Sequence, residues 1–139
     1  MNKKSVTYFF ATGTTRRAAV QIVHDNQAQL LEIRPQSPYT SADLNWHDPH
    51  SRSSLEQQDS QIRIPIEKID VSDVTELWIG FPIWWYTYPR IIDTFLESAD
   101  MTAKTIYLFA TSGGSSIEKA WHDLQLAFPR YNFVDAKKY

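Results

Sequence analysis

The chain has 139 residues, which is the size of one domain with a single hydrophobic core, so we expect one domain over 1–139. Hydrophobic residues make up 42% and charged residues 22%, the proportions of a folded globular protein. The net charge of −2 argues against nucleic acid as a partner, because phosphate-backbone binding needs a concentrated basic surface. The sequence contains no cysteine, which excludes disulfides, thiol catalysis and thiolate metal sites.

The first residues, "MNKKSVTYFF", place two lysines before an apolar run. This run ends at Thr12 without a small-residue cleavage site, so the pattern predicts a strand and not a signal peptide. No segment approaches the ~20 apolar residues of a membrane helix. We therefore expect a cytoplasmic protein with no membrane partner.

Strands and helices alternate along the predicted chain. In chain order we expect a strand over 5–11, a helix over 15–26, strands over 28–34 and 74–81, a helix begun by Pro89, a strand over 104–110, a helix opened by a capping box of Ser115 and Glu118, and a strand over 131–134. This alternation predicts an α/β fold with a parallel sheet covered on both faces. The polar segment 35–70 has room for one short helix at most, and loops of this length are usually functional.

The four glycines all lie where predicted strands end. Gly13 follows the first strand, Gly80 lies near the end of the third, and Gly113 and Gly114 follow the fourth. In an open α/β sheet, ligands bind at this carboxyl edge. The distribution favours a ligand site there over ordinary turns.

The loop "ATGTT" resembles an anion site in its chemistry. Backbone N–H groups at the start of a helix favour negative charge, and threonine hydroxyls surround them. The helix dipole disfavours the positive charges of Arg16 and Arg17 in the first turn. A bound dianion would make these two charges favourable. The pattern matches neither G-x-x-x-x-G-K-[ST] nor G-x-G-x-x-G, so it suits one terminal phosphate; the alternative is that both arginines simply face solvent.

Two further loops follow strands at the same predicted edge. "FPIWWYTYP", residues 81–89, carries Trp84, Trp85, Tyr86 and Tyr88 in a five-residue window, and these rings suit either a stacked flat ligand or a protein–protein patch. "TSGGSS", residues 111–116, offers a backbone that can approach a ligand closely and hydroxyls for polar ring edges.

Together these loops resemble the flavodoxin family, and most closely its short bacterial members with a tryptophan pair in the second loop. The matching stretches are "YFFATGTTRRAA", "ADLNWHDPHSRSS", "LWIGFPIWWYTYPRIIDTFLE" and "KTIYLFATSGGSSIEKA". The resemblance implies a doubly wound, three-layer α/β/α fold with strand order 2-1-3-4-5 and bound FMN. It implies phosphate-loop roles for Thr12, Gly13, Thr14 and Thr15, flavin-flanking roles for Pro82, Ile83, Trp84 and Trp85, and third-loop roles for Ser112, Gly113, Gly114 and Ser115, with Trp84 favoured as the stacking ring.

Three departures from the family pattern bear on function. Phe10 stands where the family usually has a hydroxyl residue, and Thr14 stands where asparagine is common. The sequence ends at "DAKKY", where the family usually continues into a closing helix. We expect an apolar strip on one sheet face to be left open, and a homodimer or another partner to cover it.

The expected function is redox chemistry on FMN, either electron transfer to a partner protein or NAD(P)H-quinone-type reduction of a small acceptor. The ligand edge is nearly neutral, unlike the acidic surface that steers basic partners. The second loop also lacks a glycine, so a backbone flip that stabilises one-electron-reduced flavin would cost about 1 kcal/mol. Both features favour two-electron chemistry. The alternative is that the protein has lost FMN and serves as a module that binds a protein partner.

No residue stands out as a catalytic acid or base. His47 and His50 have no evident third metal ligand, so no metal site is predicted. Arg52 and Ser53 in the long segment are candidates for a lid over the flavin or a substrate.

Overall fold

A computed structural model describes residues 3–10, 13–112 and 114–139. Its elements are β1 (Lys4–Tyr8), α1 (Gly13–Asn26), β2 (Gln29–Glu32), α2 (Arg52–Gln58), β3 (Glu76–Pro82), α3 (Ile91–Glu97), β4 (Thr105–Thr111), α4 (Glu118–Ala127) and β5 (Asn132–Lys138). All strand pairs are parallel, and the sheet order is β2-β1-β3-β4-β5. The predicted doubly wound α/β fold and its strand order are confirmed.

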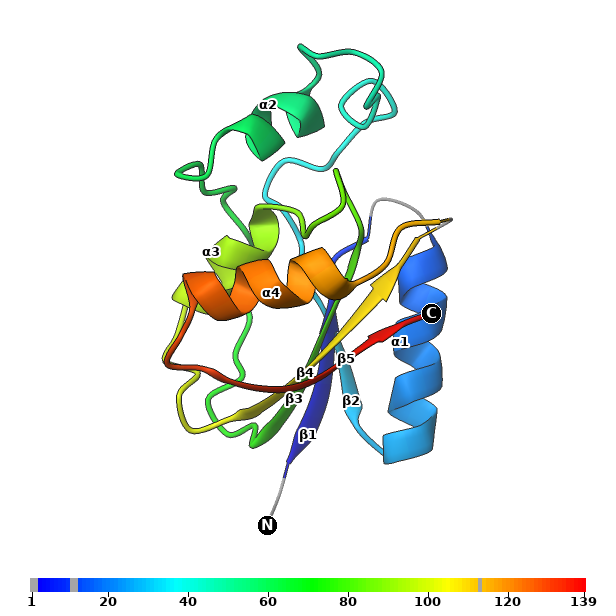
Figure 1. The fold of residues 1–139 in the computed structure, drawn as a ribbon. Coiled ribbons are helices and arrows are strands. Elements are labelled where there is room, and N and C mark those ends of the chain that lie inside the picture. Colours follow the sequence, from blue (N-terminus) through cyan, green and yellow to red (C-terminus); the bar gives the residue numbers. More distant parts are fainter. Residues whose placement is uncertain (1–2, 11–12, 113) are drawn as a thin grey trace.

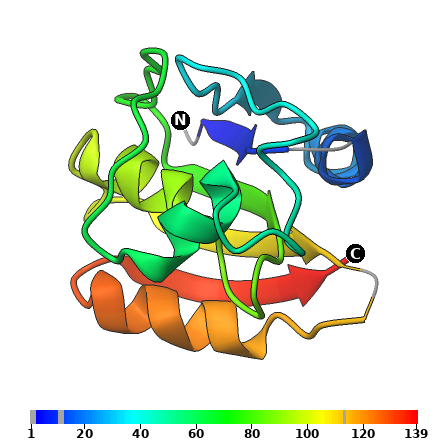
Figure 2. The same ribbon diagram turned by 90° about the horizontal axis from the view of Figure 1, so that it is seen from above.

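The sheet is the middle of three layers. Figure 1 shows α1 on one side of the sheet and α3 with α4 on the other, and Figure 2 shows the strands side by side in their order. The larger core cluster joins the apolar faces of α3 and α4 to one sheet face, with Ile91, Ile92, Phe95 and Leu96 fully buried as predicted. A smaller cluster joins Ala18, Ala19 and Ile22 of α1 to the opposite face.

The ends of several elements differ from the sequence prediction. The first strand stops at Tyr8, although the backbone N–H of Phe9 still donates to the carbonyl of Gly80. The last strand extends to Lys138 instead of 134. The predicted Ser115–Glu118 capping box is wrong: α4 begins one residue after Ile117, and its first N–H, that of Glu118, donates to the Ser116 hydroxyl at 3.4 Å.

Packing against the neighbouring strand leaves no room for a side chain at Gly80. It pairs with Phe109 of β4, and a Cβ atom at Gly80 would lie 2.0 Å from the Phe109 ring. Phe109 is buried in the α1-side cluster and has little room to move. The glycine is therefore explained by its neighbour in the sheet, and it does not argue for a ligand.

One sheet face is only partly covered by the described helices. In the α1-side layer, the rings of Trp78 and Tyr107 stack with centroids 4.5 Å apart, and both are half-buried. Val134 and Tyr139, near the end of the chain as given, are exposed. This aromatic pair lies on the α1 side of the sheet, where an open apolar strip was predicted, and both rings are half-buried.

A homodimer through the Trp78–Tyr107 face stays a prediction. We expect light scattering to give the mass of two chains, and the double variant Trp78→Lys with Tyr107→Glu to give one, because charges disfavour burial of this face. A monodisperse single-chain mass for the unaltered protein would contradict this prediction.

The long segment 35–70 folds over the carboxyl edge of the sheet and contains one short helix, α2, as expected (Figure 1). Its internal contacts are polar and aromatic. The guanidinium of Arg52 lies 3.8 Å from the centre of the Tyr39 ring and donates to Glu56, and the Tyr39 hydroxyl donates to the same carboxylate. Arg52 is thus bound within the segment. Across the described residues, no helix has the length and apolar character needed to cross a membrane.

Candidate functional site

The first loop presents an open helix N-terminus. Gly13 and Thr14 begin α1 and are exposed, and the first turn of α1 contains no acidic residue. A Cβ at Gly13 would meet no atom of the described residues within 4 Å. The first N–H groups of any helix have no intrahelical partner, and they favour an anion such as a phosphate. Thr12, also predicted for this site, lies outside the described residues.

Thr15 connects the first loop to the third. Its side chain is buried, and its hydroxyl oxygen lies 2.7 Å from that of Thr111 at the end of β4. The hydroxyl is therefore shared with a neighbouring strand. This link fixes the start of α1 relative to the loop after β4.

Phe10 lies beside Tyr8, with ring centroids 5.5 Å apart, and packs against the α1-side cluster. We expect Phe10→Ser to tighten FMN binding by about 10-fold, the equivalent of one hydrogen bond to a charged group. The same change removes a half-buried ring and should lower the free energy of unfolding by on the order of 1 kcal/mol. Fluorescence titration and urea unfolding measure the two effects, with Phe10→Ala as the control that loses the ring without adding a hydroxyl. Equal FMN affinity in both variants would contradict the hydroxyl's role.

The second loop is a two-residue turn in an unusual conformation. Trp84 and Thr87 exchange both backbone hydrogen bonds, at 2.9 and 3.0 Å, as in a tight hairpin. Between them, Trp85 and Tyr86 have φ angles of 48° and 68°. Such turns normally use asparagine and glycine, because side chains disfavour positive φ by about 1–2 kcal/mol per residue.

The absence of glycine from the second loop no longer favours two-electron chemistry. A loop without glycine was expected to avoid positive φ. Two non-glycine residues of this loop have positive φ, so the folded protein already contains this strain. The near-neutral ligand edge remains the only support for that interpretation.

The three large side chains of this loop differ in their surroundings. The Trp84 ring lies edge-on to Phe9 and Tyr39, with centroids 5.6 and 5.7 Å away, and belongs to the wall of the core. Trp85 is 39% exposed and Tyr86 is 70% exposed. The rings of Trp85 and Tyr86 are therefore freer to meet a flat ligand than the favoured Trp84.

The third loop is organised by its own serine. The Ser112 hydroxyl oxygen accepts from the N–H groups of Gly114 and Ser115, at 3.3 and 2.9 Å. The backbone N–H of Ile83 donates to the carbonyl of Thr111 at 3.0 Å, which joins the second loop to the third. A Cβ at Gly114 would also meet no atom within 4 Å. Gly113, predicted for this loop, lies outside the described residues.

A cavity of about 350 Å³ lies where the second loop, the third loop and the long segment meet. Seven side chains line it: Leu44, Trp46, Ile83, Trp84, Trp85, Tyr86 and Ser115. The predicted residues Ile83, Trp84, Trp85 and Ser115 are thus brought together. Pro82 is half-buried at the end of β3 and does not line the cavity.

Three residues of this cavity wall were not among the predicted site residues: Tyr86, whose loop was predicted, and two residues from outside the predicted loops. Leu44 and Trp46 come from the long segment, about forty positions before the second loop. The signal for Trp46 was a large aromatic ring in an otherwise polar stretch. The ring is 65% exposed and stacks on His47, with centroids 3.7 Å apart.

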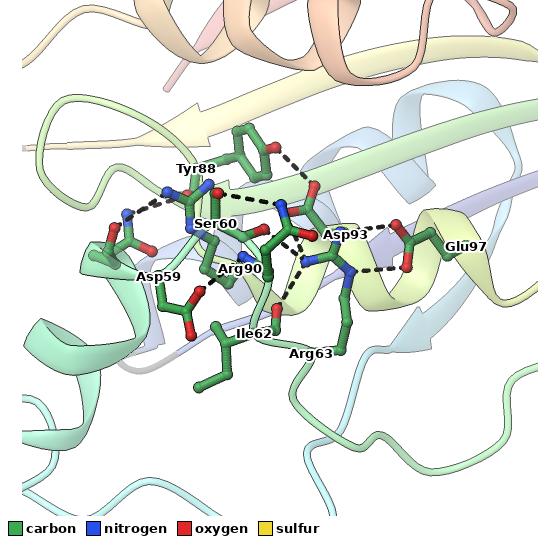
Figure 3. Close-up of polar contacts among 10 residues, drawn as sticks. Asp59, Ser60, Ile62, Arg63, Tyr88, Arg90, Asp93 and Glu97 are labelled. Carbon is green, nitrogen blue, oxygen red and sulfur yellow. Dashed lines mark hydrogen bonds and ion pairs between the residues drawn. The ribbon is translucent and has the colours of Figure 1, made fainter.

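A buried carboxyl lies directly behind the second loop. The Tyr88 hydroxyl donates to Asp93 of α3 at 2.7 Å, and Arg63 lies between Asp93 and Glu97 (Figure 3). Burial raises the pKa of Asp93, against the opposing effects of the Tyr88 hydrogen bond and the Arg63 and Arg90 charges. Burial and Asp93 likewise raise the pKa of Tyr88.

The raised pKa of Asp93 predicts a pH-dependent stability difference. The folded protein keeps the Asp93 proton at pH values where the unfolded chain has lost it, so ionisation disfavours folding as pH rises above about 4. Asp93→Asn has no proton to lose, so its stability relative to wild type should increase with pH across that window. Urea unfolding at several values between about pH 4 and 7 measures this difference. A difference that stays constant with pH would contradict the shift.

No cluster of three or more histidine, aspartate or glutamate side chains with metal-ligand geometry occurs in the described part of the chain. His47 and His50 are exposed in the long segment. The candidate site combines the N-terminus of α1 with the aromatic cavity. The two are connected through Thr111, which contacts Thr15 of α1 and Ile83 of the cavity wall. This arrangement is suited to a phosphate joined to a flat ring.

Comparison with known proteins agrees with this geometry. A profile described as flavodoxin matches residues 3–139. The chain belongs to the flavodoxin family. No curated protein sequence matches the chain.

Solved structures of three bacterial flavoproteins share the fold. A candidate flavoprotein from Bacteroides uniformis is 45% identical, with 99% of this chain and 89% of that chain covered and a TM-score of 0.96. A second, from Bacteroides eggerthii, is 41% identical over 99% and 88% of the two chains, also with a TM-score of 0.96. A Lactobacillus acidophilus flavoprotein crystallised with FMN is 18% identical over 99% and 93%, with a TM-score of 0.77, and supports the fold alone.

Proposed function

We propose that this flavodoxin-family protein binds FMN and acts as a redox protein. The observation that carries the proposal is the meeting of three loops at one sheet edge, where an open helix N-terminus lies near an aromatic cavity of about 350 Å³. Family membership supports it, and a Lactobacillus acidophilus flavoprotein with the same fold was crystallised with FMN. When bound, FMN would supply the one- or two-electron redox chemistry.

The residues present suit such a cofactor. The N–H groups of Gly13 and Thr14 at the start of α1, together with Thr12, would hold the phosphate, and no carboxylate in the first turn of α1 opposes it. Trp85 and Tyr86 would flank the ring system, and Ser115 would face its polar edge. Ser112 and Thr15 would act by fixing the loops that carry these groups.

The reaction that we favour is NAD(P)H-dependent reduction of a small quinone-like acceptor. The second candidate reaction is electron transfer to a partner protein. Arg16 and Arg17 are exposed near the phosphate loop, and the chain as a whole is close to neutral. A strongly one-sided field, which speeds docking between redox proteins, is not expected at this edge. Steady-state assays with NADH or NADPH and a benzoquinone distinguish turnover from simple electron carriage.

Titration with FMN tests the cofactor proposal. Flavin fluorescence should be quenched on binding, because the ring would lie against tryptophan and tyrosine side chains, and the purified protein should be yellow. Riboflavin, which lacks the phosphate, should bind at least about 10-fold more weakly. A colourless protein that takes up no added FMN would overturn the proposal and support the protein-binding alternative.

A further inference from the structure

The turn of the second loop receives hydrogen bonds from the long segment. The side-chain amide of Gln57, in α2, donates from one nitrogen to the carbonyls of Trp84 and Tyr88, each at 3.3 Å. The Trp84 carbonyl comes directly before the strained pair Trp85 and Tyr86, and the Tyr88 carbonyl comes two residues after it. A single side chain therefore contacts the backbone on both sides of the turn.

Gln57 is itself held in place by Arg90, the residue directly before α3. Arg90 donates from Nη2 to the backbone carbonyl of Gln57 at 3.1 Å, so the residue is fixed through its main chain while its side chain contacts the turn. The far side of the turn has separate contacts, because the Thr87 hydroxyl donates to Asp123 of α4 at 2.6 Å. The turn is thus bound between α2 and α4.

We propose that Gln57 is a positioning residue that holds the Trp84–Thr87 turn in its positive-φ conformation. Without it, Trp85 and Tyr86 would relax toward ordinary backbone angles, and the rings that they carry would leave the cavity. The role of Gln57 in the turn does not depend on the proposed function, whereas its effect on FMN binding does. Gln57 does not line the cavity, so the long segment would support the second loop from behind the cavity wall.

Hydrogen exchange in the flavin-free protein tests the inference directly. In Gln57→Leu, the N–H groups of Trp84 and Thr87 should exchange about 2- to 10-fold faster than in wild type, the effect of losing a typical hydrogen bond. The matched control is Gln58→Leu, the same change at the next position of α2. Gln58 is exposed, and among the described residues its amide donates only to the Pro49 carbonyl, at 3.5 Å, so exchange at the turn should not change.

A rescue variant separates positioning from a general loosening of α2. Adding Trp85→Asn and Tyr86→Gly to Gln57→Leu should restore slow exchange at Thr87, because asparagine and glycine accept positive φ readily. The inference is overturned if Gln57→Leu and Gln58→Leu exchange alike at the turn, or if the rescue fails while thermal unfolding shows an intact fold.

FMN titration of the single variants then links the turn to the cofactor. Gln57→Leu should weaken FMN binding by about 2- to 10-fold and change the shape of the bound-flavin absorption bands, while Gln58→Leu should match wild type. If wild-type protein takes up no FMN, the proposed function fails, and the exchange experiment still decides the role of Gln57. Faster exchange in Gln57→Leu with unaltered FMN affinity and spectrum would overturn its link to the cofactor.

Discussion

Thr14→Glu is expected to weaken FMN binding by about 10- to 100-fold while leaving the flavin-free protein as stable as wild type or slightly more so. The change places a carboxylate at the exposed N-terminus of α1, where the phosphate would lie. Repulsion between like charges and the loss of a hydrogen bond to a charged group each lower affinity. The same carboxylate interacts favourably with the helix dipole, which stabilises the flavin-free fold by about 0.3–1 kcal/mol.

Thr14→Glu is expected to lower the affinity for FMN without lowering the stability of the flavin-free protein, so a loss of binding cannot be attributed to unfolding. Thr14→Gln is the neutral control of similar length, and riboflavin is the ligand control because it carries no phosphate. Thr14→Glu should leave riboflavin binding nearly unchanged. Equal losses for FMN and riboflavin would show that the phosphate does not lie at α1.

Gly80→Ala is expected to lower the free energy of unfolding by about 1–3 kcal/mol, the usual cost of overpacking a core. The new methyl group would lie between 2.0 and 2.6 Å from three atoms of the Phe109 ring, which is buried under α1. Alanine also restricts the unfolded chain, which offsets part of this loss by about 0.4–1 kcal/mol. Urea unfolding gives the net change.

Two comparisons identify the clash as the cause. Gly114→Ala adds the same methyl group in open space and should change stability little. Combining Gly80→Ala with Phe109→Leu should cost less than the sum of the single changes, because the smaller side chain relieves the contact. Additive losses in the double variant would contradict this explanation.

The sheet and its helices could be predicted from sequence because their signals are local. Runs such as "VTELWIGF" and the spacing of Ile91, Ile92, Phe95 and Leu96 specify a buried strand and a helix face without reference to distant residues. The family motifs then implied the strand order, which the structure confirms.

Other features depend on contacts between distant segments. Gly80 was one of four glycines that suggested a ligand edge, but its cause is the register that pairs it with Phe109. No sequence rule predicts positive φ at "WY", because the turn is held by hydrogen bonds from other elements. Trp46 likewise reaches the cavity only through the path of the long segment.

The long segment also affects how the chain folds. Strands β1 and β3 pair across it, and the hydrogen bond from the Lys3 N–H to Thr75 spans 72 positions. These two strands cannot pair until the large loop between them closes, and such non-local pairing is typical of slowly folding topologies. A shorter connection without α2 would speed closure and would also remove Gln57. Folding rate and the conformation of the second loop are therefore coupled through one stretch of chain.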